Sequence, residues 1–263
     1  MDMQLRGRRA FISGSTQGIG YAIASALAGE GARVVLNGRD GRRVDELVAR
    51  LRAERPGADV AGVAADFGDA GSVARLLEAV GEVDILVNNV GLFGLAAFEA
   101  VGDDEWLRYF EVNVKSGVRM SRHLLGGMLD RGWGRIVFIG SESGVDVPAD
   151  MVHYGVTKAA MIALGNGLAK QTRGTAVTVN TVLGGPTYSD GVAGAIEELA
   201  ARRSVPIASM KEAVIGQNRT SLLERFITPA EVADLVTYIA SPRAAATNGA
   251  ALRVDGGVLA TML

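Results

Sequence analysis

The feature that most constrains the fold of this chain is a repeated alternation of short apolar runs with longer helical stretches. The apolar runs are continuous rather than alternating with polar residues, and several end in Gly, Asn or Ser. Strands of this kind are buried on both faces, and strands separated by helices pair in parallel. Right-handed crossovers then produce a doubly wound α/β sheet. The expected strands lie at 8–14, 32–38, 58–67, 83–89, 135–141, 176–184 and 250–257.

The expected helices lie between these strands, at 17–31, 42–54, 70–81, within 103–131, at 152–172 and at 228–241. We therefore predict an α/β fold of the Rossmann type, with about seven strands and helices on both faces of the sheet. The 263 residues are consistent with one domain spanning 1–263. The long segment 186–227 lacks a clear period, and we interpret it as a substrate lid.

Composition excludes several classes of function. The formal net charge is −2, so no overall electrostatic attraction favours nucleic acid or an anionic membrane. The chain has no Cys, which rules out disulfides, a thiolate nucleophile and a zinc–cysteine site. No apolar stretch is long enough for a membrane span, and the N-terminal residues do not resemble a secretory signal. We expect a cytoplasmic protein that acts on small molecules.

A glycine-rich turn joins the first strand to the first helix. The sequence SGSTQGIG (13–20) places Gly14, Gly18 and Gly20 where the chain must turn tightly and approach a ligand closely. The N-terminus of the following helix offers free N–H groups and a positive dipole end to a pyrophosphate. Because this turn has a strand before it and a helix after it, nucleotide binding is favoured over an ordinary turn.

The residue after the second strand selects between the two nicotinamide nucleotides. An acidic residue there would bind a free ribose 2′-hydroxyl, but the chain has Gly38 followed by Arg39. A guanidinium suits a 2′-phosphate, so NADP(H) is favoured over NAD(H). Asp40, the next residue, could instead be the acidic residue that binds the ribose 2′-hydroxyl. Asp66, after the third strand, could contact the adenine or cap the next helix.

Four polar residues converge on the same edge of the sheet. Ser141 ends the fifth strand, and Tyr154 and Lys158 follow 13 and 17 residues later, four positions apart on one helix. Asn113 lies in the helix between strands four and five, where Asn is unfavourable unless its amide has a partner.

With these residues in place, the chain resembles the short-chain dehydrogenase/reductase family, and in particular its subgroup with an Asn–Ser–Tyr–Lys active site. The resemblance covers nearly the whole chain. Ser13 stands where the family usually has Thr, and Gly184 where it often has Pro, but no catalytic group is lost. The matching motifs are SGSTQGIG (13–20), NNVG (88–91), Asn113, Ser141, YGVTK (154–158), VN (179–180), RFITPAEVADLVTYIASP (225–242) and NGAALRVDGG (248–257).

The resemblance implies a role for each catalytic residue. Tyr154 would be the acid–base, with its pKa lowered by the charge of Lys158, and Lys158 would also hold the nicotinamide ribose. Ser141 would donate to the substrate oxygen, and Asn113 would anchor a water that connects Lys158 to solvent. The hydride comes from the nicotinamide, so no metal is required. The nucleotide contacts would be Gly14, Ser15, Thr16, Gly18, Ile19, Gly20, Arg39, Asp66, Phe67, Asn89, Val90, Gly91, Tyr154, Lys158, Gly185 and Thr187.

The substrate follows less directly from the sequence. The expected pocket residues after strands four and five and in the lid are mostly apolar, which suits a ketone or secondary alcohol better than a bare sugar. NAD-dependent sugar, polyol or secondary-alcohol dehydrogenases and 3-oxoacyl-thioester reductases remain alternatives, and a catalytically inactive nucleotide-binding scaffold is a further one. The resemblance also implies a homotetramer.

Overall fold

A parallel sheet of seven strands forms the centre of the computed structural model, which describes residues 1–216 and 220–262. The strand order is β3-β2-β1-β4-β5-β6-β7, as a doubly wound sheet requires. The order reverses beside β1, so a crevice is expected where the carboxyl ends of β1 and β4 diverge. The strands are β1 Arg9–Ile12, β2 Arg33–Gly38, β3 Val60–Ala64, β4 Ile85–Asn88, β5 Trp133–Ser141, β6 Ala176–Gly184 and β7 Ala251–Val254.

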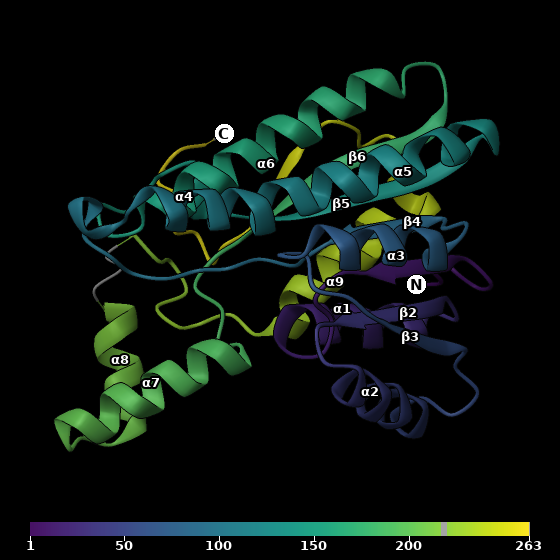
Figure 1. Cartoon of the computed structure of the whole chain (residues 1–263). Coiled ribbons are helices and arrows are strands. Elements are labelled where there is room, and N and C mark those ends of the chain that lie inside the picture. The colour runs from purple at the N-terminus through teal and green to yellow at the C-terminus, as the bar shows by residue number, and fades with distance from the viewer. Residues whose placement is uncertain (217–219, 263) are drawn as a thin grey trace.

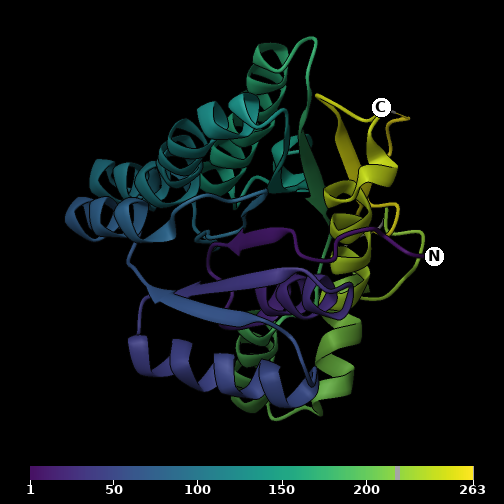
Figure 2. The same cartoon turned by 90° about the vertical axis from the view of Figure 1, so that its right-hand side faces the viewer.

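Helices cover both faces of the sheet, as Figures 1 and 2 show. One apolar cluster joins the sheet to α1, α2 and α9, and a second joins the other face to α3, α5 and α6. The inner strands β1, β2, β4, β5 and β6 are buried by these layers, which explains their continuous apolar sequences, whereas the edge strands β3 and β7 are mostly exposed or half-buried. The helices of the two layers are α1 Gly18–Gly29, α2 Gly41–Glu54, α3 Ala70–Val80, α4 Asp103–Tyr109, α5 Ser116–Asp130, α6 Val152–Gln171 and α9 Pro229–Ala240.

The helix expected within 103–131 is divided into three parts. Between α4 and α5 the chain forms a π-helical turn, η2 (Phe110–Lys115), and this turn contains Asn113. Such turns insert an extra residue into a helix and often occur at functional sites. Asn113 therefore lies at a break in helical geometry rather than inside a regular helix.

The segment 186–227, expected to be irregular, contains two helices, α7 (Asp190–Arg203) and α8 (Ile207–Gly216). Residues 217–219 of this segment lie outside the described residues. The two helices pack around a small apolar cluster of Ile196, Ala200 and Met210 and project from the body of the molecule (Figure 1). We call α7 and α8 the lid helices. Within the described residues, no helix is both long enough and apolar enough to cross a membrane.

Candidate active site

A cavity of about 630 Å³ opens at the carboxyl ends of β1, β2 and β4, where the strand order reverses. Its volume lies in the range typical of small-molecule sites. Eleven of the residues expected to contact a nucleotide line it. These are Gly14, Thr16, Gly18, Ile19, Gly20, Arg39, Asp66, Phe67, Asn89, Val90 and Gly91.

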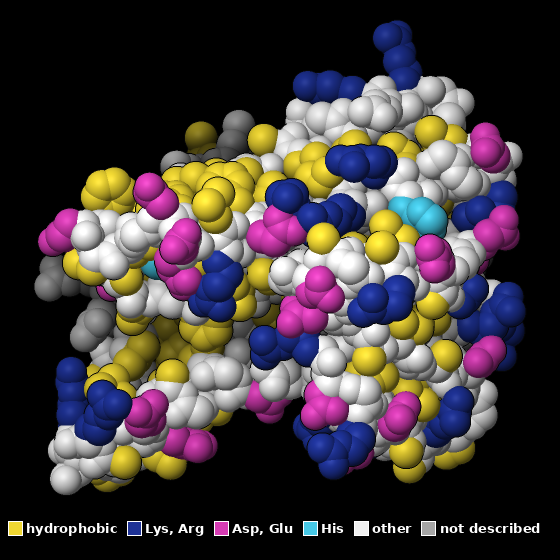
Figure 3. Space-filling view, viewed as in Figure 1, with side chains coloured by type: hydrophobic (Ala, Val, Ile, Leu, Met, Phe, Trp, Pro, Cys, Tyr) yellow, Lys and Arg dark blue, Asp and Glu magenta, His cyan; other side chains and the backbone are white. Residues whose placement is uncertain are grey.

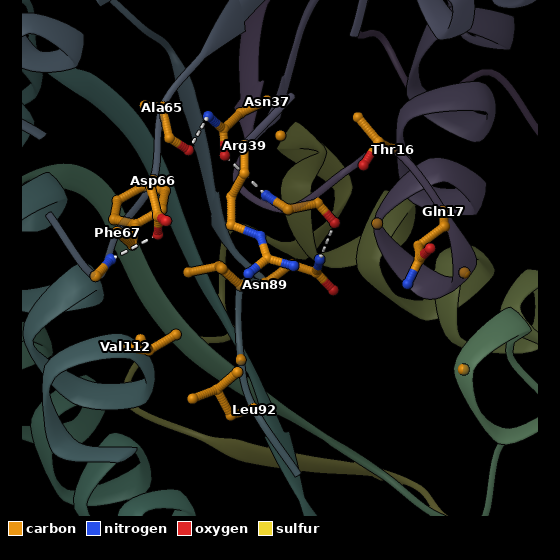
Figure 4. Close-up of a pocket in the computed structure, with 18 of the residues that line it drawn as sticks. Thr16, Gln17, Asn37, Arg39, Ala65, Asp66, Phe67, Asn89, Leu92 and Val112 are labelled. Atoms are coloured by element: carbon orange, nitrogen blue, oxygen red, sulfur yellow. Dashed lines mark hydrogen bonds between the residues drawn. The ribbon is translucent and has the colours of Figure 1, made fainter. Parts of the chain in front are cut away.

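The glycine turn is held in shape by polar contacts from two neighbouring strands. Asn89 Nδ2 donates to the carbonyl oxygens of Ser13 and Gly14, both at 2.9 Å, and Gly14 N donates to Asn37 Oδ1 at 3.0 Å (Figure 4). Gly14 has φ +60, a conformation that side chains disfavour. A Cβ on Gly20 would lie 2.5 Å from Asn89 Nδ2 and 2.5 Å from Gly14 O. The turn thus requires glycine at both positions, and its backbone forms a cradle that fits a pyrophosphate.

The end of β2 packs closely against the glycine turn. A Cβ on Gly38 would lie 2.5 Å from Thr16 Cγ2, so a larger residue there would require the Thr16 side chain to move. Arg39 lines the cavity, and its side chain extends over it in Figure 4. Asp40 instead caps α2, because its side chain accepts hydrogen bonds from Arg42 N and Arg43 N. The carboxylate of Asp40 is therefore already hydrogen-bonded to the backbone of α2.

Some of the expected nucleotide contacts are held by hydrogen bonds within the protein, and Ser15, Gly185 and Thr187 lie outside the cavity lining. Asp66 lines the cavity, and its Oδ1 accepts a hydrogen bond from Gly68 N at 2.9 Å (Figure 4). Ser15 is fully buried and donates to Ile12 O at 2.8 Å. Thr187 donates to Gly185 O at 2.8 Å, and neither residue is part of the cavity lining.

The cavity also includes residues that sequence reasoning missed. Ser189 and Gly191 reach it from the lid, and Asn37 reaches it from β2. Asn37 could have been predicted from the sequence, because it is a polar residue near the end of an otherwise apolar strand. Ser189 could not, because only the folded lid brings it to the glycine turn. Gly38, at the expected ribose-reading position, also lines the cavity, as do Leu92 and Phe93, which were expected in the substrate pocket. The other unexpected lining residues are Gln17, Ala65, Gly68, Asp69, Arg108 and Val112.

The residues expected to be catalytic, which we call the reactive residues, lie beyond the inner end of this cavity. Ser141 ends β5, and α6 carries Tyr154 and Lys158 on one face. Lys158 Nζ lies 5.6 Å from the centre of the Tyr154 ring and donates to Ile139 O at 2.8 Å. Ser141 lies close enough to the Tyr154 phenol to act on its pKa. The structure therefore brings these three residues together as the sequence predicted.

Asn113 joins this group through the loop after β4. It is completely buried; its Oδ1 accepts from Leu92 N at 2.7 Å, and its Nδ2 donates to Thr157 Oγ1 at 2.9 Å. A Cβ built on Gly91 would lie 3.6 Å from Asn113 Oδ1 and 3.7 Å from Lys158 Nζ. Asn113 and Lys158 therefore flank the same glycine at the inner end of the cavity, so the nucleotide cavity and the reactive residues are contiguous.

The ionisation of this group differs from the sequence expectation. Burial raises the pKa of the Tyr154 phenol above its usual 10, although the neighbouring Ser141 hydroxyl acts in the opposite direction. Burial also lowers the pKa of Lys158 from 10.5 to about 8, while the charge of Glu142 opposes this shift. In the free chain, desolvation therefore sets the direction of the Tyr154 shift, whereas the resemblance implied that Lys158 would lower this pKa.

Comparison with known proteins identifies the family. The sequence model described as short chain dehydrogenase matches residues 8–199, which is most of the chain. The chain belongs to the short-chain dehydrogenase/reductase family. Short-chain dehydrogenases of this kind are NAD(P)-dependent oxidoreductases that act on carbonyl compounds or alcohols, and this chain is one of these enzymes.

Similar short-chain dehydrogenases match over almost their full length. The Bacillus subtilis oxidoreductase YvaG is 41% identical over 98% of each chain. The 3-oxoacyl-acyl-carrier-protein reductase FabG of Vibrio cholerae is 32% identical over 97% of this chain and 99% of its own. The structure of L-sorbose reductase from Gluconobacter frateurii, complexed with NADPH and L-sorbose, aligns with a TM-score of 0.94 and 32% identity over 100% of both chains.

Proposed function

We propose that this enzyme transfers a hydride between NADP(H) and a ketone or secondary alcohol, with Tyr154 as the acid–base. The observation that carries the proposal is the placement of Ser141, Tyr154 and Lys158 beside the inner end of a cavity whose glycine turn fits a dinucleotide. When bound, the nicotinamide supplies or accepts the hydride. The chain's own residues have to orient the carbonyl and handle the proton.

Each reactive residue has a role that matches its surroundings. With its pKa raised by burial, the Tyr154 phenol is protonated near neutral pH and can donate its proton to the carbonyl oxygen during reduction. Ser141 would stabilise the negative charge that develops on the same oxygen. The buried Lys158 would hold the ribose hydroxyls. Asn113 would fix the loop after β4 beside Lys158 and hold the water of a proton relay.

The proposed preference for NADP(H) rests on the end of β2. Arg39 offers a guanidinium to a 2′-phosphate, Asp40 is engaged as a helix cap, and the space beside Gly38 is filled by Thr16. The similar L-sorbose reductase was solved with NADPH, which supports the same preference.

The proposed substrate is a small carbonyl compound or the corresponding alcohol. Figure 3 shows a hollow between the lid helices and the body of the molecule, with hydrophobic side chains along it. Such a hollow suits a partly apolar ketone. The names of similar proteins point to two narrower classes, a ketose and a 3-oxoacyl thioester, and both belong in the same assay.

The proposal is tested by a panel of substrates and nucleotides. Purified enzyme is mixed with NADPH or NADH and with simple ketones, hydroxyketones, ketoses and 3-oxoacyl thioesters, and cofactor absorbance is followed. We expect faster turnover with NADPH, and a loss of this preference of about tenfold in Arg39→Ala, the size of one charge-assisted contact. Arg42→Ala, which changes an exposed guanidinium outside the cavity lining, is the matched control. Absence of turnover across the panel would support an inactive scaffold and contradict the proposal.

A further inference from the structure

A carboxyl group that the reaction does not require lies directly beside the reactive residues. Glu142 follows Ser141 at the carboxyl end of β5 and begins the short helix η3 (Glu142–Gly144). The Glu142 carboxylate contacts the serines on both sides of it in the chain. Its Oε2 lies 2.5 Å from Ser141 Oγ, and its Oε1 accepts a hydrogen bond from Ser143 Oγ at 3.3 Å.

The charge of this carboxyl affects the pKa values of both Tyr154 and Lys158. Ionised Glu142 raises the pKa of the Tyr154 phenol and also acts to raise the pKa of Lys158. Burial raises the pKa of Glu142 itself, while hydrogen bonds from Ser141 and Ser143 partly offset this. A negative charge at this position opposes the negative charge that develops on a carbonyl oxygen during reduction. Glu142 is therefore unfavourable for reduction unless the substrate gives it a partner.

The single hydroxyl hydrogen of Ser141 gives a second reason why Glu142 needs a partner from the substrate. A serine hydroxyl has one hydrogen to donate, and Ser141 Oγ donates it to Glu142 Oε2 rather than to the Tyr154 phenol, while Ser143 N donates to Ser141 Oγ at 3.1 Å. Ser141 cannot give the same hydrogen to a substrate oxygen while it gives it to Glu142. If Ser141 turns to the substrate, the half-buried Glu142 carboxylate loses its closest donor and keeps only the longer hydrogen bond from Ser143 Oγ, which costs free energy.

A substrate hydroxyl next to the reacting carbonyl would resolve this conflict. In an α-hydroxyketone, the hydroxyl oxygen lies about one hydrogen-bond length from the carbonyl oxygen, so the two oxygens can face Glu142 and Ser141 together. We infer that Glu142 is a specificity-determining residue that accepts a hydrogen bond from a hydroxyl on the carbon adjacent to the reacting carbonyl. The preferred substrates are then α-hydroxyketones, and in the reverse direction vicinal diols. This inference rests on the proposed function and narrows its substrate class.

The test uses a matched pair of substrates, 1-hydroxy-2-butanone and 2-butanone, with NADPH. For wild type, Glu142→Gln and Glu142→Ala, the measured quantity is the ratio of kcat/KM for the hydroxyketone to that for the plain ketone. We expect this ratio to fall about 10- to 100-fold in both variants, as for loss of a hydrogen bond to a charged group. The kcat/KM for 2-butanone should change by a smaller factor than that for the hydroxyketone, because 2-butanone has no hydroxyl to donate to Glu142. Asp150→Asn, an exposed carboxyl near the end of the same loop, is the control.

The outcomes separate this inference from the proposed function. A wild-type enzyme that reduces both ketones equally well, or variants that lower both rates by the same factor, would overturn the role of Glu142 while the reductase itself stands. If wild type reduces no carbonyl compound with either nucleotide, the proposed function fails and the inference fails with it. Thermal melting and quenching of protein fluorescence by NADPH establish that each variant is folded. Glu142→Gln, which keeps the shape of the side chain, decides the question if Glu142→Ala does not fold.

Discussion

At the scale of single residues, Tyr154 carries the most direct prediction. Its phenol is the proton donor in the proposed reaction, and phenylalanine keeps the ring while removing only that group. We expect Tyr154→Phe to lower kcat/KM for ketone reduction by about 10²- to 10⁴-fold, the usual contribution of a general acid. NADPH affinity, measured by fluorescence titration, should change no more than a few-fold. A variant that retains the wild-type rate would show that another group supplies the proton.

Lys158 makes a separate prediction about stability. Its pKa is about 8 in the folded chain and near 10.5 when unfolded, so between these values the unfolded chain binds more protons. The free energy of unfolding should therefore gain up to about 1.4 kcal/mol per pH unit from this residue as the pH rises from 8 to 10. The gain is absent below about pH 8, where Lys158 is charged in both states.

Urea unfolding of wild type and Lys158→Met at pH 8, 9 and 10 checks this effect. Other titrating groups contribute equally to both proteins, so the difference between them isolates Lys158. The raised pKa of Tyr154 acts mainly above pH 10, outside this window. We expect wild type to gain stability relative to Lys158→Met as the pH rises. Parallel pH profiles would mean that Lys158 keeps an ordinary pKa despite its burial.

For these single residues, the sequence indicated their relative positions but not their ionisation. Spacing alone placed Tyr154 and Lys158 on one helical face and Ser141 at the neighbouring strand end, and the structure brings them together. The resemblance implied that Lys158 lowers the Tyr154 pKa, whereas burial raises this pKa in the free chain. Desolvation depends on everything packed around the phenol, and that packing is a property of the whole fold.

At the scale of elements, the sheet and its two layers were predictable, because continuous apolar strands and amphipathic helices leave clear patterns. The lid helices were not predictable from the sequence. Helix α7 is rich in Ala and Gly and buries only Ile196 and Ala200, so its apolar positions show no strong helical period. The π-helical turn at Asn113 was also missed, since an inserted residue depends on contacts such as those with Leu92 and Thr157.

The lid makes a contact that predicts how it affects nucleotide binding. Asp190, the first residue of α7, accepts a hydrogen bond from Gly18 N at 2.6 Å, at the N-terminus of α1. This N–H belongs to the cradle that fits a pyrophosphate, so the Asp190 carboxylate would compete with a phosphate oxygen and repel it. We expect Asp190→Asn to bind NADPH about three- to tenfold more tightly.

Fluorescence titration of the purified enzymes with NADPH measures this change directly. Glu197→Gln, an exposed carboxyl on the same helix, is the control and should bind as wild type does. The gain should shrink as salt is added, because part of it is charge repulsion. Weaker binding by Asp190→Asn would mean that Asp190 supports the nucleotide-bound form of the lid instead of competing with the nucleotide.

At the scale of the whole molecule, large apolar side chains are exposed on both helical layers. On α4, Leu107 is 67% exposed and, with Phe110, lines a second hollow beside Glu111 and Lys115. On the opposite layer, Tyr238 of α9 is 38% exposed. Two different symmetric interfaces generate a tetramer. We propose these two surfaces as the candidate interfaces of the homotetramer that the resemblance implies.

The assembly can be tested with one charge placed on each surface. Wild type should have a mass of about four times 27.4 kDa by light scattering coupled to size exclusion. Leu107→Asp and Tyr238→Asp each put an unpaired charge into one interface only, so each variant should give dimers, and the double variant should give monomers. Wild type that elutes as a monomer would contradict the proposal. If only one variant dissociates, the face that tolerates its charge lies outside any interface, and the second contact must be sought elsewhere on the surface.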